Sequence, residues 1–319
     1  MNISTIGIDL AKNVFQVHGV DAKGKHVLKK RLSRSKFLPF FANLPPCVIG
    51  LEACGSSNHW ARKLRASGHE VRLMSPQYVK PYIKTNKNDA NDAEAICEAV
   101  SRPGMRFVPT KNIEQQDIQV VHRVRERLVH ERTALVNQIR GILREYGIFI
   151  PVGINPFRKR IPEVLEDAQN DLTPLTRAII ADQYTCLHEL DRSIAEYDQR
   201  INAIFRSNEQ FQRLSTIDGV GPMTATALIA AVGDAKTFRN GRHLAAWLGL
   251  VPRQHSSGER HRLMGISKRG NTYLRTLLIH GARSVLQRCD SRTDARSRWL
   301  QGLKERRGFN RACVALANK

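Results

Sequence analysis

The 319-residue sequence predicts an α/β domain followed by a mostly helical remainder. In the first 74 residues, short apolar runs with strand periodicity alternate with helical patterns. From residue 112 to residue 205, apolar side chains recur at helical spacing. The length is enough for about two domains with cores of their own. Hydrophobic residues make up 41% of the chain, so most of it should fold.

The first strand opens a hairpin around which the other elements are organised. Ile6, Ile8 and Leu10 alternate with small or polar residues, which is the period of a half-buried strand, and a second apolar run follows a polar turn. Asp9 is therefore expected at the end of a strand that lies in a core. A carboxylate is costly to bury there unless it is paired or binds a metal. A turn-capping role for Asp9 is the alternative.

The elements that follow complete a sheet. In chain order we expect a strand over 26–32, a helix over 37–44, a strand over 47–52, a helix that ends at Gly68 and a strand over 70–74. Three strands, helix, strand, helix, strand is the order of a ribonuclease-H-like sheet. In that fold the first and fourth strands are neighbours, so Asp9 and Glu52 should approach each other.

Two more acids lie on a later predicted helix. Asn88 suits the N-cap of an Ala-rich helix, and Asp89 and Asp92 share one face because they are three residues apart. Acids in a first turn are also favoured by the helix dipole, which is the alternative. With Asp9 and Glu52 they make four carboxylates, whose mutual repulsion a hard cation such as Mg²⁺ offsets. Two such ions about 4 Å apart hold both the attacking and the leaving oxygen of a phosphodiester.

The charge of the chain indicates a polyanionic partner. Its formal net charge is +22 and its pI is about 10.3, and nucleic acid is the usual partner of such a chain. Residues 239–319 contain 18 Lys or Arg against four acids. A solvated basic face, or bulk affinity for RNA of the ribosomal type, is the alternative. We expect no membrane partner and a cytoplasmic protein, because no membrane span and no secretory signal is visible. Six scattered cysteines without a C-x-x-C pair indicate reduced thiols and no zinc knuckle.

The middle of the chain predicts two long helices, over 112–146 and about 175–205, with a linker over 151–162 between them. The second helix lacks enough clean heptads to establish a coiled coil. The first is expected to pack through its apolar face, and its other faces offer arginines to a nucleic-acid backbone: Arg123, Arg125, Arg127, Arg132 and Arg140.

The last third contains two Gly-containing motifs next to helix starts. Residues 214–228 look like a helix-hairpin-helix, in which Gly219 and Gly221 bring backbone N–H groups against a phosphate. An ordinary Gly-Pro turn is the alternative. Polar loops before a helix that starts near residue 273 form a second expected phosphate site, with Arg260, Arg262, Lys268 and Arg269.

Three of these segments resemble a known family. Residues 7–12, 51–55 and 87–93 are similar to the three motif blocks of the DEDD transposases of the bacterial insertion sequence 110 family, 1111 subgroup, and the resemblance covers nearly the whole chain. It implies a RuvC-like domain over 1–110, a coiled-coil region for self-association over 111–210 and a transposase domain with the helix-hairpin-helix over 211–319. The implied Mg²⁺-binding catalytic tetrad, for which Mn²⁺ can substitute, is Asp9, Glu52, Asp89 and Asp92.

The resemblance also assigns a serine. By residue type alone, Ser257 is a loop hydroxyl, because no adjacent base activates it. The family implies a nucleophilic serine in a Ser-Gly loop, and Ser257 matches it, with Ser256 leaving the assignment open by one residue. It further implies a covalent phosphoserine link to DNA, an acidic site that another subunit can supply, and a bridge RNA that pairs with donor and target DNA. The expected assembly is a dimer or tetramer. The chain ends inside a helical pattern where family members usually continue, so we expect a shortened last helix.

The leading hypothesis is an RNA-guided, Mg²⁺-dependent DNA recombinase that moves its own insertion sequence. One alternative is a RuvC-like structure-specific endonuclease that uses metal-activated water, with Ser257 as a DNA contact. Another is a non-catalytic nucleic-acid-binding protein built around the helix-hairpin-helix. A tyrosine recombinase is disfavoured, because Tyr273 lacks a nearby Arg/His-x-x-Arg set.

Overall fold

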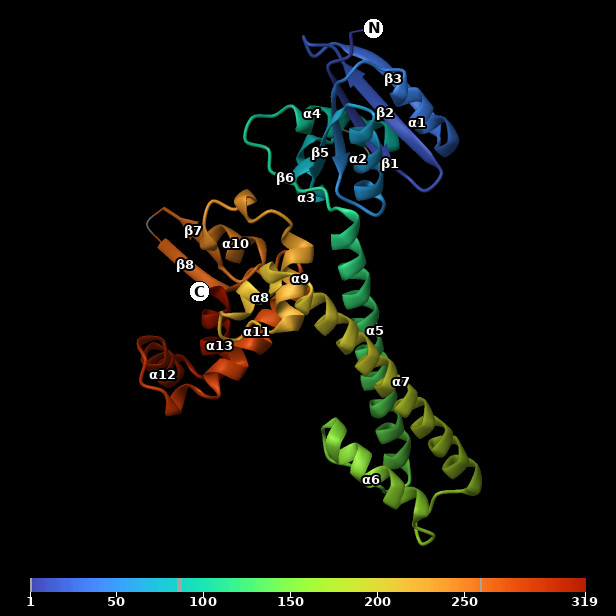
Figure 1. The fold of residues 1–319 in the computed structure, drawn as a ribbon, viewed down its shortest axis with the longest axis vertical. Coiled ribbons are helices and arrows are strands. Elements are labelled where there is room, and N and C mark those ends of the chain that lie inside the picture. Colours follow the sequence, from blue (N-terminus) through green and yellow to red (C-terminus); the bar gives the residue numbers. More distant parts are fainter. Residues whose placement is uncertain (1, 85–87, 259) are drawn as a thin grey trace. The chain divides into compact units, whose positions relative to one another are not determined.

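The computed structural model describes residues 2–84, 88–258 and 260–319 (Figure 1). The chain forms two compact units. Unit 1 contains Met1–Ile113 and Val232–Thr237, and unit 2 contains Glu114–Ala231 and Phe238–Lys319. The division into three domains at residues 110 and 210 stays a prediction. Within the described residues, no helix is long and apolar enough to cross a membrane.

Unit 1 is built on a six-stranded mixed sheet with the order β3-β2-β1-β4-β5-β6. Only the β1–β4 and β4–β5 pairs are parallel. The mixed α/β class and the expected neighbourhood of the first and fourth strands are confirmed, which is consistent with a RuvC-like domain. The sixth strand, of two residues, was not expected. The strands are β1 Thr5–Leu10, β2 Val14–Val20, β3 His26–Ser33, β4 Val48–Glu52, β5 Glu70–Met74 and β6 Phe107–Val108.

Helices cover both faces of this sheet. On one face, Phe15, Phe37 and Trp60 pack with ring centroids 4.5–5.1 Å apart, joining β2 to two helices. Ile6 and Ile8 belong to the same core. The helix that carries Asp89 lies against the other face. The helices are α1 Arg34–Ala42, α2 Ser57–Ala66, α3 Pro76–Val79, the 3₁₀ turn η1 Lys80–Tyr82 and α4 Asp89–Val100.

Two glycines let α4 lie directly on the sheet. A Cβ atom at Gly7 would be 2.2 Å from the carbonyl oxygen of Ala93, and one at Gly50 would be 2.8 Å from Cβ of Val100. Gly7 and Gly50 are register partners on β1 and β4. A side chain at Gly7 would therefore push α4 off the sheet, and one at Gly50 would force the side chain of Val100 to move.

Unit 2 contains an antiparallel pair of long helices, α5 Ile113–Glu145 and α7 Pro174–Arg206 (Figure 1). Arg125 pairs with Asp198 at 2.5 Å, and Arg132 pairs with Asp191 at 3.2 Å. The two ion pairs are seven residues apart along each helix. Both long helices agree with the predicted spans within two residues. The coiled coil for self-association stays a prediction.

The predicted linker over 151–162 is wrong, because helix α6 spans Ile154–Glu166. Pro162 lies inside it and has no N–H to donate to the carbonyl of Arg158. The hydroxyl of Tyr184 donates to that carbonyl instead, at 3.4 Å. Phe157 and Ile161 are buried in a core shared with α5 and α7, so packing overrides the proline.

The rest of the described elements are short helices and one hairpin. They are α8 Glu209–Ser215, α9 Pro222–Val232, the 3₁₀ turn η2 Ala235–Thr237, α10 Gly241–Trp247, β7 Pro252–Ser257, β8 Arg260–Ile266, α11 Thr272–Leu286, the 3₁₀ turn η3 Cys289–Ser291, α12 Ala295–Arg307 and α13 Phe309–Asn318. The expected apolar helix over 238–250 is only α10. The segment predicted as polar loops contains the two-stranded β7–β8 hairpin, in which every described residue from 252 to 265 is exposed.

Candidate active site

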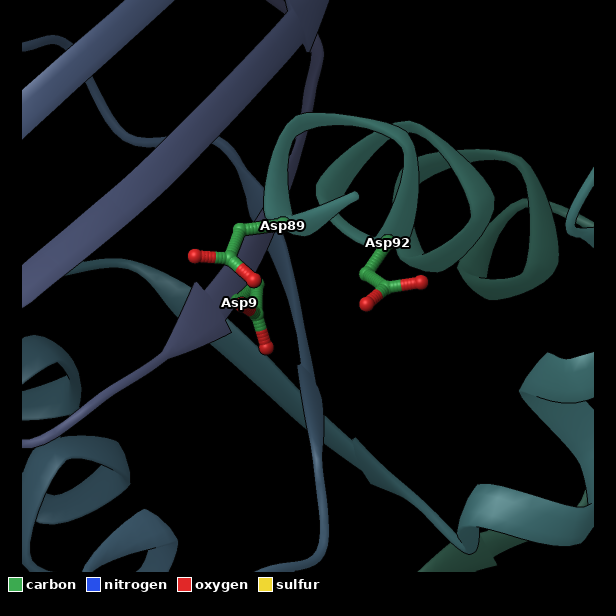
Figure 2. A group of neighbouring side chains, drawn as sticks. All are labelled: Asp9, Asp89 and Asp92. Carbon is green, nitrogen blue, oxygen red and sulfur yellow. The ribbon is translucent and has the colours of Figure 1, made fainter. Parts of the chain in front are cut away.

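Three of the four predicted acids meet at one edge of the sheet. Figure 2 shows Asp9 at the end of β1 and Asp89 and Asp92 on the first turn of α4. One carboxylate oxygen from each lies within 4.8 Å of the others. The side chain of Asn88 accepts a hydrogen bond from the N–H of Ala90, which fixes the start of α4 as expected. Lys87, part of the third motif block, lies outside the described residues.

Asp9 is in an unfavourable environment for a negative charge. Partial burial raises its pKa from 3.8 to about 6, and the charges of Asp89, Asp92 and Glu52 add to this effect. The backbone N–H of Leu10 opposes the shift by hydrogen bonding. A bound cation would stabilise the ionised form of a carboxylate whose pKa is raised in this way.

Glu52 lies next to this group. Ile8 pairs with Leu51, so Asp9 and Glu52 are the following residues on two adjacent parallel strands. The charge of Glu52 contributes to the raised pKa of Asp9. Among the described residues, however, the group within 4.8 Å is Asp9, Asp89 and Asp92. Glu52 is thus at the edge of the cluster.

The donor set fits a hard divalent cation. All four side chains are carboxylates, which Mg²⁺ and Mn²⁺ prefer. Oδ1 of Asp92 is buried and, within the described part of the chain, has no hydrogen-bond partner. An unpaired buried carboxylate oxygen is costly, and a bound cation would satisfy it.

Comparison with known proteins identifies the family. A sequence profile described as "Transposase IS116/IS110/IS902 family" matches residues 211–298, and a profile of the IS110 DEDD group, described as "Transposase", matches residues 6–148. The chain belongs to the IS110 family of transposases. It is therefore an enzyme that catalyses DNA strand transfer, and the DEDD family suggests dependence on a divalent metal.

Several curated proteins are similar to this transposase over its full length. A "Probable family 20 transposase" of Pseudomonas aeruginosa is 53% identical over 100% of this chain and 95% of its own. The "Transposase for insertion sequence element IS1111A" of Coxiella burnetii is 48% identical over 100% of this chain and 87% of its own. The "Transposase for insertion sequence element IS1328" of Yersinia enterocolitica is 41% identical over 100% of this chain and 94% of its own.

The hairpin of the transposase separates the two candidate serines. Ser257 pairs with Arg260 and His255 pairs with Arg262, so these four side chains share one face of the hairpin. Ser256, which pairs with His261, is on the other face. The amide of Gln254 donates to Oγ of Ser256 at 2.9 Å.

Ser257 is exposed, and within the described residues its hydroxyl has no hydrogen-bond partner. The basic residues predicted beside it are also exposed: Arg260 and Arg262 on β8, and Lys268 and Arg269 after it. Arg260 and Arg262 therefore lie on the same face of the hairpin as Ser257, whereas Lys268 and Arg269 follow the end of β8 at the base of the hairpin. The sequence did not predict the two strands β7 and β8.

Gly219 of the predicted helix-hairpin-helix has a packing role. Its φ is +87°, and a Cβ atom there would be 2.8 Å from the carbonyl oxygen of Gly281 on α11. Gly221 is exposed directly before α9 and has open space around it. The turn between α8 and α9 is where the motif predicts it. Its contact with DNA stays a prediction.

The long helices of the transposase offer less positive charge than expected. Arg125 and Arg132 are paired with aspartates of α7, and Arg140 donates to the carbonyls of Pro151 and Gly153. Residues 111–210 contain 14 Lys or Arg and 15 Asp or Glu. The excess of positive charge lies in residues 1–110, with 17 against 8, and residues 211–319, with 20 against 6.

The sequence did not predict the glycines that support the acidic site. Gly7 and Gly50 precede Asp9 and Glu52 by two residues each, in Gly-Ile-Asp and Gly-Leu-Glu. This repeated spacing is a signal that could have identified them.

Proposed function

We propose that this transposase cuts and rejoins DNA with Ser257 as nucleophile and with a divalent cation, Mg²⁺ or Mn²⁺, held by Asp9, Glu52, Asp89 and Asp92. The observation that carries the proposal is the cluster of three carboxylates within 4.8 Å, one of which has a buried oxygen without a hydrogen-bond partner among the described residues. When bound, the cation supplies electrostatic stabilisation of the phosphoryl group in its transition state.

The hairpin side chains have complementary roles in this proposal. Arg260 and Arg262 hold the non-bridging oxygens of the scissile phosphate on the face that carries Ser257. Oγ of Ser257 then forms a bond to phosphorus, and the bond from phosphorus to one deoxyribose oxygen breaks. The serine proton is lost to solvent, and the leaving oxygen gains a proton. Rejoining is the reverse attack of a strand hydroxyl on the phosphoserine.

The proposal extends to partners. We assign donor and target DNA, a guiding bridge RNA and further copies of the chain in a dimer or tetramer, acting on DNA in the cytoplasm. The positive charge concentrated in residues 1–110 and 211–319 supports binding of nucleic acid by both ends of the sequence. Gly219 and Gly221 are assigned to a helix-hairpin-helix, and Lys268 and Arg269 to a phosphate contact.

Covalent trapping tests the proposal. Purified protein, its cognate RNA, Mg²⁺ and end-labelled DNA are denatured and examined for a protein–DNA adduct, in parallel with Ser257→Ala, Ser256→Ala and Asp9→Asn. We expect an adduct that is lost in Ser257→Ala, kept in Ser256→Ala and strongly reduced in Asp9→Asn. An adduct that survives Ser257→Ala refutes the nucleophile.

A RuvC-like endonuclease that uses water is the second candidate. It is favoured by the assembly of the acidic cluster within unit 1, without any residue of the hairpin. The same assay separates the two: DNA cleavage without an adduct, insensitive to both serine variants and lost in Asp9→Asn, supports the endonuclease. Membership of a transposase family sets the non-catalytic alternative aside.

A further inference from the structure

The hairpin that carries Ser257 lacks a core of its own. All described side chains from residue 252 to residue 265 are exposed, and β7 pairs only with β8. A two-stranded hairpin without packing is marginally stable at best. Its direction relative to the rest of unit 2 must therefore be set at its base, where the two strands join the helical part.

At the base, the chain before β7 and the chain after β8 are in direct backbone contact. The N–H of Ser267 donates to the carbonyl of Val251 at 2.8 Å, and the N–H of Lys268 donates to that of Gly249 at 3.0 Å. A Cβ atom at Gly249, whose φ is +74°, would be 1.9 Å from the carbonyl oxygen of Arg269. Lys268 has a φ of 54°, which is unusual for a residue with a side chain. The two legs of the hairpin are thus closely fitted to each other.

One arginine connects both legs to α11. Arg275 is only 7% exposed. Its Nη1 donates to the carbonyl of Leu248 at 3.0 Å and to that of Arg269 at 3.4 Å, while its Nη2 donates to Oγ1 of Thr272 at 3.1 Å. Leu248 precedes β7 and Arg269 follows β8. A single guanidinium therefore joins the entry and the exit of the hairpin to one helix.

The chemistry of this contact is specific to arginine. Among the described residues, the acceptors of Arg275 are carbonyls and a hydroxyl, and no carboxylate pairs with it. Burying a charge without a counter-charge is costly. The planar fork of arginine can reach several acceptors at fixed angles, which the single ammonium of lysine cannot reproduce.

We infer that Arg275 is a positioning residue that fixes the direction of the β7–β8 hairpin and, through it, the placement of Ser257. The catalytic half of this inference rests on the proposed function of Ser257. The structural half, that Arg275 holds the hairpin, is independent of the function of Ser257.

The experiment compares Arg275→Lys with Arg283→Lys, a matched change at an exposed arginine two turns later on α11. Limited trypsin digestion with mass spectrometry measures cleavage in the hairpin and its exit, at Arg253, Arg260, Arg262, Lys268 and Arg269. DNA affinity and the initial rate of adduct formation are measured on the same full-length proteins. Circular dichroism and thermal unfolding report on the overall fold.

We expect Arg275→Lys to increase hairpin cleavage about tenfold, because local opening becomes easier. Adduct formation should slow roughly 100-fold, the order of loss that follows a misplacement of about 1 Å. DNA affinity should stay within about threefold, because the net charge is kept. Arg283→Lys should match the wild type in all measurements. Equal hairpin cleavage and equal adduct rates in the two variants overturn the inference.

Two features keep the outcomes separate. If the Ser257→Ala protein still forms the protein–DNA adduct, the proposed nucleophile is wrong. The trypsin digestion still decides whether Arg275 holds the hairpin in that case. If Arg275→Lys does not fold, Thr272→Val replaces it, because this variant removes only one acceptor of the guanidinium. We then expect the increase in hairpin cleavage and the loss of adduct rate to be about a third as large as for Arg275→Lys. Hairpin cleavage of Thr272→Val at the wild-type rate contradicts the inference that Arg275 holds the hairpin.

Discussion

Gly7 on β1 and Gly50 on β4 are direct register partners, and each precedes a carboxylate of the acidic site by two residues. Together they form a strip of sheet without side chains, on which α4 rests. Because α4 carries Asp89 and Asp92, the distance between these acids and Asp9 depends on this contact.

Gly7→Ala should lower the affinity for Mn²⁺ roughly 10- to 100-fold, the range seen when support of a metal site is removed. The added methyl meets backbone atoms of α4 at 2.2–2.3 Å, so the helix must move. Gly50→Ala should cost less, because the nearest atom at 2.8 Å belongs to the side chain of Val100. Isothermal titration with Mn²⁺ measures both. Gly141→Ala on α5, where nothing lies within 4 Å, is the control and should leave the affinity unchanged.

Asp9→Asn should raise the thermal unfolding temperature of the metal-free protein by a few degrees at about pH 7.5. The raised pKa of Asp9 means that the folded protein holds this proton more tightly than the unfolded chain does. The stability from this group is present below about pH 4 and is lost as the pH rises through about 6. The difference between the variant and the wild type should therefore shrink at acidic pH. With saturating Mg²⁺ the order should reverse, and a variant that remains more stable in Mg²⁺ contradicts the site.

Cys54 should report on metal binding through its alkylation rate. Cys54 is exposed. Desolvation by neighbouring atoms, and then the charges of Glu52 and Asp9, raise the pKa of its thiol. A cation that neutralises these carboxylates lowers the thiol pKa, so iodoacetamide should modify Cys54 several-fold faster in Mg²⁺ than in EDTA. Peptide mass spectrometry measures the rate. The exposed Cys186 on α7 is an internal control, and an equal change at both thiols would indicate a global effect.

His122→Gln should make unit 2 less sensitive to acid. His122 is buried between the hydroxyls of Tyr273 and Thr226, each 2.9 Å from a ring nitrogen, and burial lowers its pKa to about 4. The stability from neutral His122 is present above about pH 6.5 and is lost as the pH falls towards 4. Between about pH 7 and pH 4.5, the wild type should lose about 2 kcal/mol of unfolding free energy relative to the variant.

Urea denaturation at the two pH values measures this difference. His130→Gln, at an exposed position of the same helix, should show none. Burial also raises the pKa of Tyr273 to about 12. A difference for His122→Gln that is independent of pH would show that the ring is not held neutral.

Local patterns were sufficient to predict the elements whose periodicity lies within their own residues. The strand ending at Met74 and the helix beginning near Leu175 were predicted within a residue or two. The pattern was insufficient for α6, where Pro162 signals a break and only contacts with α5 and α7 override it. It was also insufficient for β7 and β8, because strands exposed on both faces carry no apolar alternation.

The acidic site was predictable because its residues follow strand and helix boundaries that the sequence marks. Asp9 ends a strand and Asp89 begins a helix, and the structure brings them together as expected. The contribution of Arg275 was not predictable, since its partners are carbonyls of Leu248 and Arg269, which have no signature in side-chain type. The role of Ser257 stays a prediction.

The exposure of the hairpin has an evolutionary consequence. Replacing a side chain there removes little buried apolar surface, so most substitutions between residues 252 and 265 should cost little folding stability. Under the proposed role of Ser257, selection on this segment would act through strand transfer and not through folding. Related insertion sequences could therefore change hairpin residues to fit new DNA ends without compensating changes in a hydrophobic core.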